Sequence, residues 1–438
     1  MASFGSADLN TQQGNAHQAS AAQNRFALIS LTSLFFIWGF ITAMNDILIP
    51  HLKGVFNLTY TQAMLVQFCF FGAYFLVSIP AGKIVAKFGY KAGIAMGLLG
   101  AAVGCVMFVP SAKLEMYWMF LLALFVLASG ITLLQVAANP LVTLIGNPNT
   151  ASSRLNLTQA FNSLGTTIAP IIGGFLIFGA MGEGGGHGEH GAGGSADTVI
   201  LPYLTLAAIL VLLALFFKFS QLPENQHSSD ASSDGSSNNS PNENATAHSA
   251  GSQTSLKQYP HLLLGAVGIF VYVGAEVSVG SFLINFLGEP HIAGMSEAQA
   301  AQYVAYFWGG AMIGRFIGAA IMQKVAANKL LAVNSFASML LIAIAMFTEG
   351  KLAMWSLLAV GLCNSIMFPT IFSLAINKLG GDTSRGSGLL CLAIVGGAII
   401  PVFQGMLADM NDVQSSFILP LLCYVFIAFY GLKGYRPA

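Results

Sequence analysis

The sequence predicts an all-α integral membrane protein whose twelve transmembrane helices form two groups of six. Three observations predict this fold class. Only 8% of the 438 residues are charged, 55% are apolar and the mean hydropathy is +0.71, whereas a soluble domain carries roughly a quarter charged residues. The apolar residues also gather in twelve long runs, and the second half of the chain repeats a pattern found in the first.

Each apolar run is near or above the ~20 residues that a helix needs to cross the hydrocarbon core of a bilayer. The first group of helices is predicted at residues 26–56, 62–82, 92–110, 117–145, 155–179 and 198–219. The second group is predicted at residues 261–287, 300–323, 330–348, 354–376, 387–408 and 417–433.

Polar segments flank and divide the two groups. Residues 1–24 are rich in Asn, Gln and Ala and lack the basic start of a secretory signal peptide, so we expect a tail. Residues 220–258 consist largely of Ser, Asn, Asp and Gly, which cannot bury enough apolar surface to fold, so we expect a disordered linker. The two bundles are then residues 25–219 and 259–438.

The basic residues are distributed unequally between the two sides of the membrane. When alternate loops are assigned to opposite sides, thirteen Lys and Arg residues fall on the side of the termini, and only Lys53, Lys113 and Lys351 fall opposite. Because basic residues favour the cytoplasmic side, both termini and the linker are predicted to be cytoplasmic.

Composition and motifs exclude several other classes of protein. A net charge of zero gives no electrostatic footprint for nucleic acid. The chain has neither a catalytic constellation nor a phosphate-binding Gly loop with a lysine, which excludes an enzyme and ATP-driven transport. The five cysteines lie within apolar runs without a CxxC motif, so they indicate core packing. His187, Glu189 and His190 lie in a Gly-rich loop that fixes no geometry, so we expect no metal there.

The two halves of the chain resemble each other at a fixed distance. Ser153 and Arg154 match Ser384 and Arg385, 231 residues further on. Paired six-helix halves joined by a polar linker are typical of transporters that bind substrate between the halves and alternate access by rocking.

When the charged residues of loops, tails and helix ends are set aside, three remain within the predicted helices: Asp46, Glu276 and Arg315. Each costs at least ~2.5 kcal/mol at the bilayer centre, so each is a candidate functional residue. The two acids lie 230 residues apart, in matching places of the first helix of each half. They are predicted to couple transport to a cation, either H⁺ or Na⁺, although a structural hydrogen bond between helices is the alternative. For Arg315, we expect a structural role between helices or a side chain that extends towards the interface.

Uncharged polar residues form stripes at helical spacing. Gln159, Asn162 and Thr166 share one helix face, and Gln135 and Asn139 share another. Amides and tyrosines suit a sugar, which needs many donors and acceptors, and an aromatic plane suits its apolar face. The predicted sugar-binding residues are Asn45, Gln67, Gln135, Asn139, Gln159, Asn162, Tyr272, Trp308 and Asn364. The alternative is that these amides join helices to each other in lipid.

The loop GKIVAKFGYK places Lys83, Lys87 and Lys91 at four-residue steps. We interpret these lysines as a gate that caps the carbonyl ends of neighbouring helices. Alternatively, they only determine the topology.

Five segments carry a resemblance to a known family: NDILIP, LLQVAANPLVTLIG, RLNLTQAFNSLGTTIAP, VYVGAEVSVGSFL and MFPTIFSLAINKLG. Together they resemble the fucose/glucose-galactose symporter family of the major facilitator superfamily. The resemblance implies a major facilitator fold of two pseudo-symmetric bundles and cation-driven monosaccharide uptake across a bacterial inner membrane.

The resemblance also assigns roles to individual residues. Asp46 matches the acid of the family's first helix, and Gln159 and Asn162 match its sugar-contacting amides. Gln135 stands where the fucose branch has a glutamate, and Glu276 stands where that branch has a glutamine. These two differences resemble the glucose/galactose branch, some of whose members use sodium.

The leading hypothesis is therefore a monomeric symporter, without a cofactor, that imports a neutral hexose such as glucose or galactose with H⁺ or Na⁺. N-acetylglucosamine and fucose are alternative substrates. A membrane sugar sensor with a transporter fold is an alternative of another class, and drug efflux is disfavoured by the number of amides.

Overall fold

The computed structural model describes residues 22–44, 56, 60–178, 199–220 and 255–437. Ten helices in these residues are long and apolar enough to cross a membrane. One of them, α2 (Tyr60–Lys113), consists of two helices joined at Gly89, and α4 (Ala151–Phe178) is a further long helix. The described part of the chain thus contains the twelve predicted helices.

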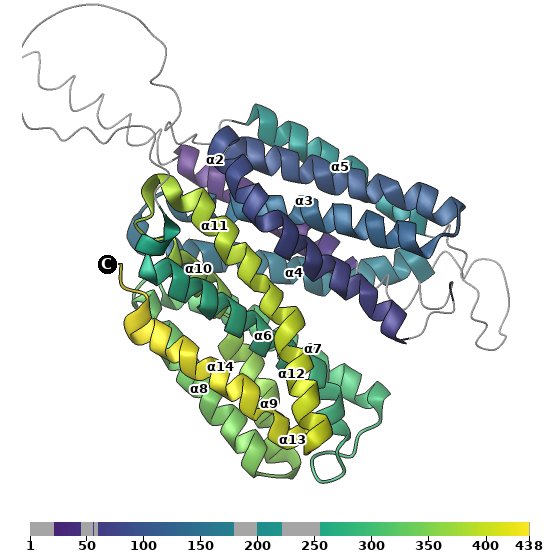
Figure 1. The fold of residues 1–438 in the computed structure, drawn as a ribbon, viewed down its shortest axis with the longest axis vertical. Coiled ribbons are helices and arrows are strands. Elements are labelled where there is room, and N and C mark those ends of the chain that lie inside the picture. The colour runs from purple at the N-terminus through teal and green to yellow at the C-terminus, as the bar shows by residue number, and fades with distance from the viewer. Residues whose placement is uncertain (1–21, 45–55, 57–59, 179–198, 221–254, 438) are drawn as a thin grey trace, which may run out of the picture.

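The helices form two bundles (Figure 1). The first bundle contains Ala22–Met44, α2, α3 (Tyr117–Leu144), α4 and α5 (Ile200–Phe219). The second contains α6 (Pro260–Gly288), α7 (Glu297–Ile321), α8 (Ala327–Phe347), α9 (Gly350–Asn364), α10 (Met367–Ala375), α11 (Thr383–Leu392), α12 (Gly396–Met410), α13 (Val413–Ser416) and α14 (Ile418–Phe429). Short 3-10 turns and a final π-helical turn, Tyr430–Gly434, complete the described chain.

Several predicted helices differ from a single continuous rod. The run at 354–376 is divided into α9 and α10 at Ser365 and Ile366, and the run at 387–408 is divided into α11 and α12 by a 3-10 turn. Conversely, the runs at 62–82 and 92–110 join through Gly89, whose φ of 83° is a conformation that glycine adopts without a steric penalty. Hydropathy reports how long an apolar run is, and it does not report where its backbone turns.

Side chains near the helix ends pair with backbone groups that the helices leave open. Ser296 and Gln299 form a capping box at the start of α7. At the end of α3, the Arg154 guanidinium donates to the carbonyl oxygens of Val142, Thr143 and Asn147. These contacts matter in a membrane because hydrocarbon supplies no partner for an open carbonyl group.

The two bundles meet at one end of the molecule. We call this the linker end, because α5 finishes there at Phe219 and α6 begins there at Pro260. There, α11 packs against α2 and α3, and α4 packs against α7 and α10. The bundles spread apart towards the other end, where α13 lies (Figure 1). We call the plane of contact the seam.

Hydroxyl groups carry the hydrogen bonds across the seam at the linker end. Ser153 Oγ on α4 donates to the Ala319 carbonyl oxygen on α7 at 2.6 Å. Ser387 Oγ on α11 donates to the Val136 carbonyl oxygen on α3 at 2.9 Å. Serine side chains of both bundles therefore donate across the seam to backbone carbonyl groups of the other bundle.

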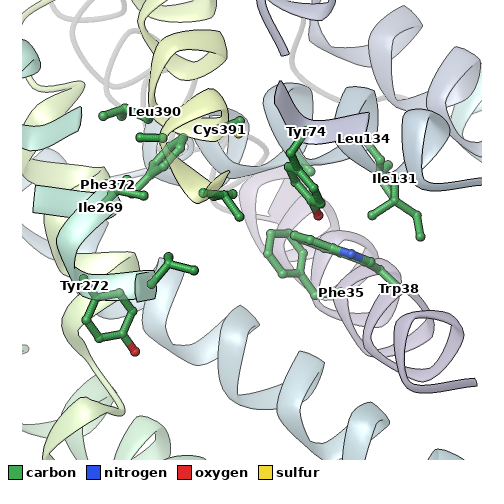
Figure 2. Close-up of a cluster of buried hydrophobic side chains, with 14 of the residues drawn as sticks. Phe35, Trp38, Tyr74, Ile131, Leu134, Ile269, Tyr272, Phe372, Leu390 and Cys391 are labelled. Atoms are coloured by element: carbon green, nitrogen blue, oxygen red, sulfur yellow. The ribbon is translucent and has the colours of Figure 1, made fainter. Parts of the chain in front are cut away.

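Glycines bring the two backbones into direct contact at the seam. A Cβ atom on Gly388 of α11 would lie 2.7 Å from the Ser78 carbonyl oxygen and 3.3 Å from Gly82 Cα, both on α2. Buried apolar side chains of both bundles continue from this contact as one cluster. Figure 2 shows members of this cluster from the first bundle (Phe35, Trp38, Tyr74, Ile131, Leu134) and from the second (Ile269, Tyr272, Phe372, Leu390, Cys391).

Replacing Gly388 with alanine is expected to destabilise the closed linker end. The added methyl group would overlap the backbone of α2, and overpacking of this kind costs about 1–3 kcal/mol. The measurement is the free energy of unfolding in mixed micelles titrated with a denaturing detergent.

The matched control is Gly72→Ala in α2, because a Cβ atom there meets nothing within 4 Å. If the two variants have equal free energies of unfolding, the close approach of α11 to α2 at Gly388 does not contribute to stability.

Candidate functional site

A group of amides lies where α3 and α4 face each other. Gln159 Nε2 on α4 donates to Asn139 Oδ1 on α3 at 3.5 Å. Gln135, one turn earlier on α3, accepts a hydrogen bond of 2.8 Å from the Tyr74 hydroxyl group on α2. Gln135, Asn139 and Gln159 are all buried. The structure thus brings together these three predicted sugar-binding residues.

Asn162 orients α4 against the first helix. Its Nδ2 atom donates to the Phe35 carbonyl oxygen at 2.9 Å. Gly39 and Gly165 permit this approach, because a Cβ atom on either would lie 2.0–2.1 Å from a carbonyl oxygen of the facing helix. Asn162 therefore belongs to the same stripe as Gln159 and also joins two helices.

A second polar group lies in the other bundle, around the break between α9 and α10. Asn364 is the last residue of α9 and is fully buried. Its backbone carbonyl oxygen accepts from the Tyr272 hydroxyl group at 2.9 Å, and its Oδ1 accepts from the Tyr424 hydroxyl group at 2.6 Å. The two tyrosines hold Asn364 in one orientation.

Some buried polar atoms of these two groups have no hydrogen-bond partner in the described part of the chain. They are Asn139 Nδ2 in the first bundle, and Asn364 Nδ2 and Glu276 Oε1 in the second. A buried polar atom without a partner costs free energy. These three atoms are therefore the ones that a polar ligand or water molecule would satisfy.

Arg315 and Glu276 form an ion pair within the second bundle. Arg315 Nη2 lies 3.8 Å from Glu276 Oε1, and the two side chains are 16% and 13% exposed. Arg315 Nε donates to the Ser365 carbonyl oxygen at 3.0 Å, at the break between α9 and α10. Arg315 Nη1 also donates to Ser163 Oγ on α4, in the first bundle. Arg315 thus joins helices, as the sequence predicted, and it joins them both within the second bundle and across the seam.

Other candidates lie outside this group or outside the described residues. Trp308 is 43% exposed, and a Cβ atom on Gly280 would lie 3.1 Å from its ring. Gln67 belongs to α2, but its side chain lies outside the described part of the structure. The residues Asn45, Asp46, His187, Glu189 and His190 also lie outside the described ranges.

The three candidate gate lysines lie in the middle of α2, near the Gly89 kink, at the linker end of the molecule. Lys83 and Lys87 are exposed, and Lys87 Nζ lies 5.2 Å from the centre of the neighbouring Phe88 ring. Lys91 follows the Gly89 kink and lines a cavity of about 700 Å³ between the bundles, together with Lys378, Asn149 and Asn328. The gate role stays a prediction.

Sequence reasoning missed two polar residues of the site. Ser163 stands four residues after Gln159, so helical spacing on α4 contained a signal for it. Tyr424 stands in an apolar run, and no pattern in the sequence indicated that its hydroxyl group reaches Asn364.

The chain is similar to known membrane transporters. It is 56% identical over 420 residues, 95% of this chain and 97% of the relative, to a glucose/galactose transporter of Brucella abortus biovar 1. It is 34% identical over 442 residues, 97% of each protein, to the L-fucose-proton symporter of Escherichia coli K12. These similarities confirm the resemblance read from the sequence.

A solved structure shares the fold. The structure of FucP, a major facilitator superfamily transporter in the outward conformation, matches with a TM-score of 0.80 and 30% identity. The match covers 94% of this chain and 99% of that one. Residues 29–394 also match the profile of the Major Facilitator Superfamily. The chain belongs to the major facilitator superfamily, a family of transporters and not of enzymes.

Proposed function

We propose that the protein is a secondary active transporter that imports a neutral hexose of the glucose/galactose type by proton symport. The greater similarity to the glucose/galactose transporter than to the fucose symporter supports the substrate class. The fucose-proton symporter among the relatives supports the proton as the coupling ion. Transport follows alternating access between the two bundles.

The contact between α4 and α7 is the observation that carries the proposal. Arg315 on α7 donates to Ser163 on α4, one turn after Gln159. It also donates to the carbonyl oxygen of Ser365, the residue after Asn364. The two polar groups consequently share one seam. They consist mainly of amides and tyrosines, which suit a sugar that offers many hydroxyl groups and no charge.

The uncharged donors and acceptors have distinct roles in this proposal. Gln159 and Asn139 would form the first-bundle face of the sugar site, with Gln135 held by Tyr74. Asn364 Nδ2, which has no partner, would donate from the second bundle. Trp308, Asn45, Gln67, Asn162 and Tyr272 complete the proposed sugar-binding set.

Asp46 and Glu276 are the proposed coupling acids. A charged carboxylate in a closed, water-poor site is unfavourable, and a proton removes that charge. The carrier with protonated acids would therefore close and reopen on the other side more readily than the carrier with charged acids.

The orientation and location are also part of the proposal. We place the protein in a bacterial inner membrane as a monomer with both termini and the 220–258 linker on the cytoplasmic side, as the distribution of basic residues indicates. The linker end then faces the cytoplasm, and the described conformation, with contacts at that end, is outward-facing. Lys83, Lys87 and Lys91 would lie at the cytoplasmic gate.

Gradient-driven uptake tests the transport function. In proteoliposomes, an inward proton gradient is expected to accumulate labelled glucose or galactose above the external concentration. Asp46→Asn is expected to abolish accumulation while it retains exchange of sugar across the membrane, because a fixed neutral side chain removes the coupling but not the sugar site.

If uptake instead requires a sodium gradient, the coupling ion is Na⁺ and not H⁺. Competition by unlabelled fucose or N-acetylglucosamine, and not by glucose or galactose, would change the substrate. Absence of uptake of all four sugars under either gradient would reject the symporter and favour a sensor.

Truncation of the amides tests the sugar site. Gln159→Ala and Asn162→Ala are each expected to raise the KM for sugar about tenfold, because each removes a hydrogen bond that contributes about 1 kcal/mol and leaves its partner unpaired. The measurement is the initial rate of uptake against sugar concentration. Asn334→Ala is the matched control, since its Nδ2 bonds only to the Leu330 carbonyl oxygen within α8. A KM change as large in the control would refute the assignment.

The orientation has its own test. A fluorescent protein fused to the C-terminus is expected to be fluorescent in bacterial cells, because it folds on the cytoplasmic side, and a periplasmic phosphatase fused at the same place is expected to be inactive. The opposite result for the pair of fusions would invert the topology.

A further inference from the structure

Arg315 is a largely buried charged residue that contacts both bundles at the seam. Its guanidinium group has three partners: it forms an ion pair with Glu276 on α6, and it donates to the Ser365 carbonyl oxygen at the helix break and to Ser163 on α4. The first two belong to its own bundle and the third belongs to the other. A change in any one partner therefore alters the contact between the bundles.

Arg315 holds Glu276 by charge and not by a hydrogen bond. At 3.8 Å, the distance from Arg315 Nη2 to Glu276 Oε1 exceeds hydrogen-bond length, and Oε1 has no hydrogen-bond partner in the described residues. An ion pair in a buried place is weakly screened, so the carboxylate still compensates the guanidinium charge. Its unpartnered oxygen remains available to a proton.

The position of Arg315 on α7 decides which end of the seam it affects. It lies less than two turns before Ile321, where α7 finishes at the linker end. Ala319, one turn further on, accepts the bond from Ser153 on α4. Opening the linker end must separate α7 from α4, and this movement breaks both bonds.

Few other titratable groups face Glu276. Within the described residues, Arg315 on α7, Tyr272 one turn earlier on α6, and Tyr424 on α14 interact with it electrostatically. The tyrosine hydroxyl groups donate to Asn364. Arg315 is thus the only cation among these described neighbours.

We infer that Arg315 converts protonation of Glu276 into opening of the linker end. With Glu276 ionised, the Arg315 charge is compensated and the seam stays closed. When a proton binds Glu276, Arg315 keeps only two neutral acceptors, and a buried cation without a counter-ion is unfavourable. Opening the seam breaks the bond to Ser163, admits water to the guanidinium group, and lets the proton leave Glu276 on that side.

The same contact reaches the amide stripe. Ser163 Oγ donates to the Gln159 carbonyl oxygen at 3.0 Å while it accepts from Arg315. Release of Arg315 therefore changes the hydrogen bonding of α4 next to Gln159. This inference rests on the proposed role of Glu276 as a coupling acid, and it adds the residue through which that acid acts.

Distances between spin labels at the linker end test the inference. Asn149→Cys and Gln323→Cys place one label on each bundle at exposed positions. The background is Cys69→Ser, because the other four native cysteines are buried. Pulsed electron resonance of the full chain, without sugar or gradient, gives the ratio of long to short distances as a function of pH.

The expected result is a ratio that rises as the pH falls. Glu276→Gln mimics the protonated acid, so it should raise the ratio about tenfold at alkaline pH, the effect of losing one charged partner. Adding Arg315→Met to Glu276→Gln should remove the pH response, since neither charge remains, and should lower the alkaline ratio to that of Ser163→Ala, since only the bond to Ser163 across the seam is then missing. A Glu276→Gln variant with an unchanged ratio would overturn the inference.

Two further variants separate the charge from the packing. Arg315→Lys keeps the charge and is expected to keep the pH response. It still tests the role of the charge at position 315 if the Arg315→Met variant does not fold. Ser163→Ala removes the acceptor across the seam but not the ion pair, so it should raise the ratio at every pH and keep the pH response. Loss of the pH response in Ser163→Ala, or its retention in the double variant, would contradict the role given to Arg315.

These measurements are independent of sugar transport. A chain that opens with protonation in this Arg315-dependent way but accumulates no hexose retains the inference and rejects the proposed substrate. A chain that accumulates hexose but whose opening ignores Glu276 and Arg315 retains the proposed function and rejects the inference.

Discussion

The arrangement of polar residues depends on one constraint: hydrocarbon cannot hydrogen-bond, so every polar group within the bilayer must be paired inside the protein. Arg154 meets this constraint by capping the end of α3, and Arg315 meets it at the break between α9 and α10. Nine buried side-chain atoms of the described residues have no partner. Three of them, Asn139 Nδ2, Asn364 Nδ2 and Glu276 Oε1, lie in the two groups that face the seam, where a polar substrate would complete their pairing.

The same constraint explains how two bundles are held together and still separate. The contacts across the linker end are a glycine pair, Gly82 and Gly388, and hydrogen bonds from serines such as Ser153 and Ser387. Each such bond contributes about 1 kcal/mol. Because the individual contacts are weak and reversible, the loss of one charge at Glu276, the partner of Arg315, is comparable in free energy to the sum of a few of them.

The sequence predicted the helices well and their interruptions poorly. Length and apolar composition located every membrane-spanning helix of the described chain, because spanning a bilayer requires both. The charges Glu276 and Arg315 were found for the same reason, since they are unfavourable in lipid. Their pairing was not predicted, because contacts between residues 39 positions apart in the chain depend on how α6 and α7 pack. Hydropathy likewise did not predict the helix break after Asn364 or the hydrogen bond from Tyr424 to Asn364. The amides alone indicated only a sugar, because they suit many sugars. The narrower class of substrate came from the resemblance of the sequence motifs to a family.

The break between α9 and α10 has a mechanical consequence. The α9 part packs against α7 and α8 in the interior of its own bundle, whereas the α10 part packs against α6 and against α4 across the seam. One transmembrane segment is thereby divided into an anchored half and a seam half, with Ser365 and Ile366 as the joint. A tilt of α10 about this joint would release Thr370 and Ser373 from their partners on α4 without disturbing the α9 anchor. Access at the linker end can then change by the swing of a nine-residue lever, in addition to any rocking of whole bundles.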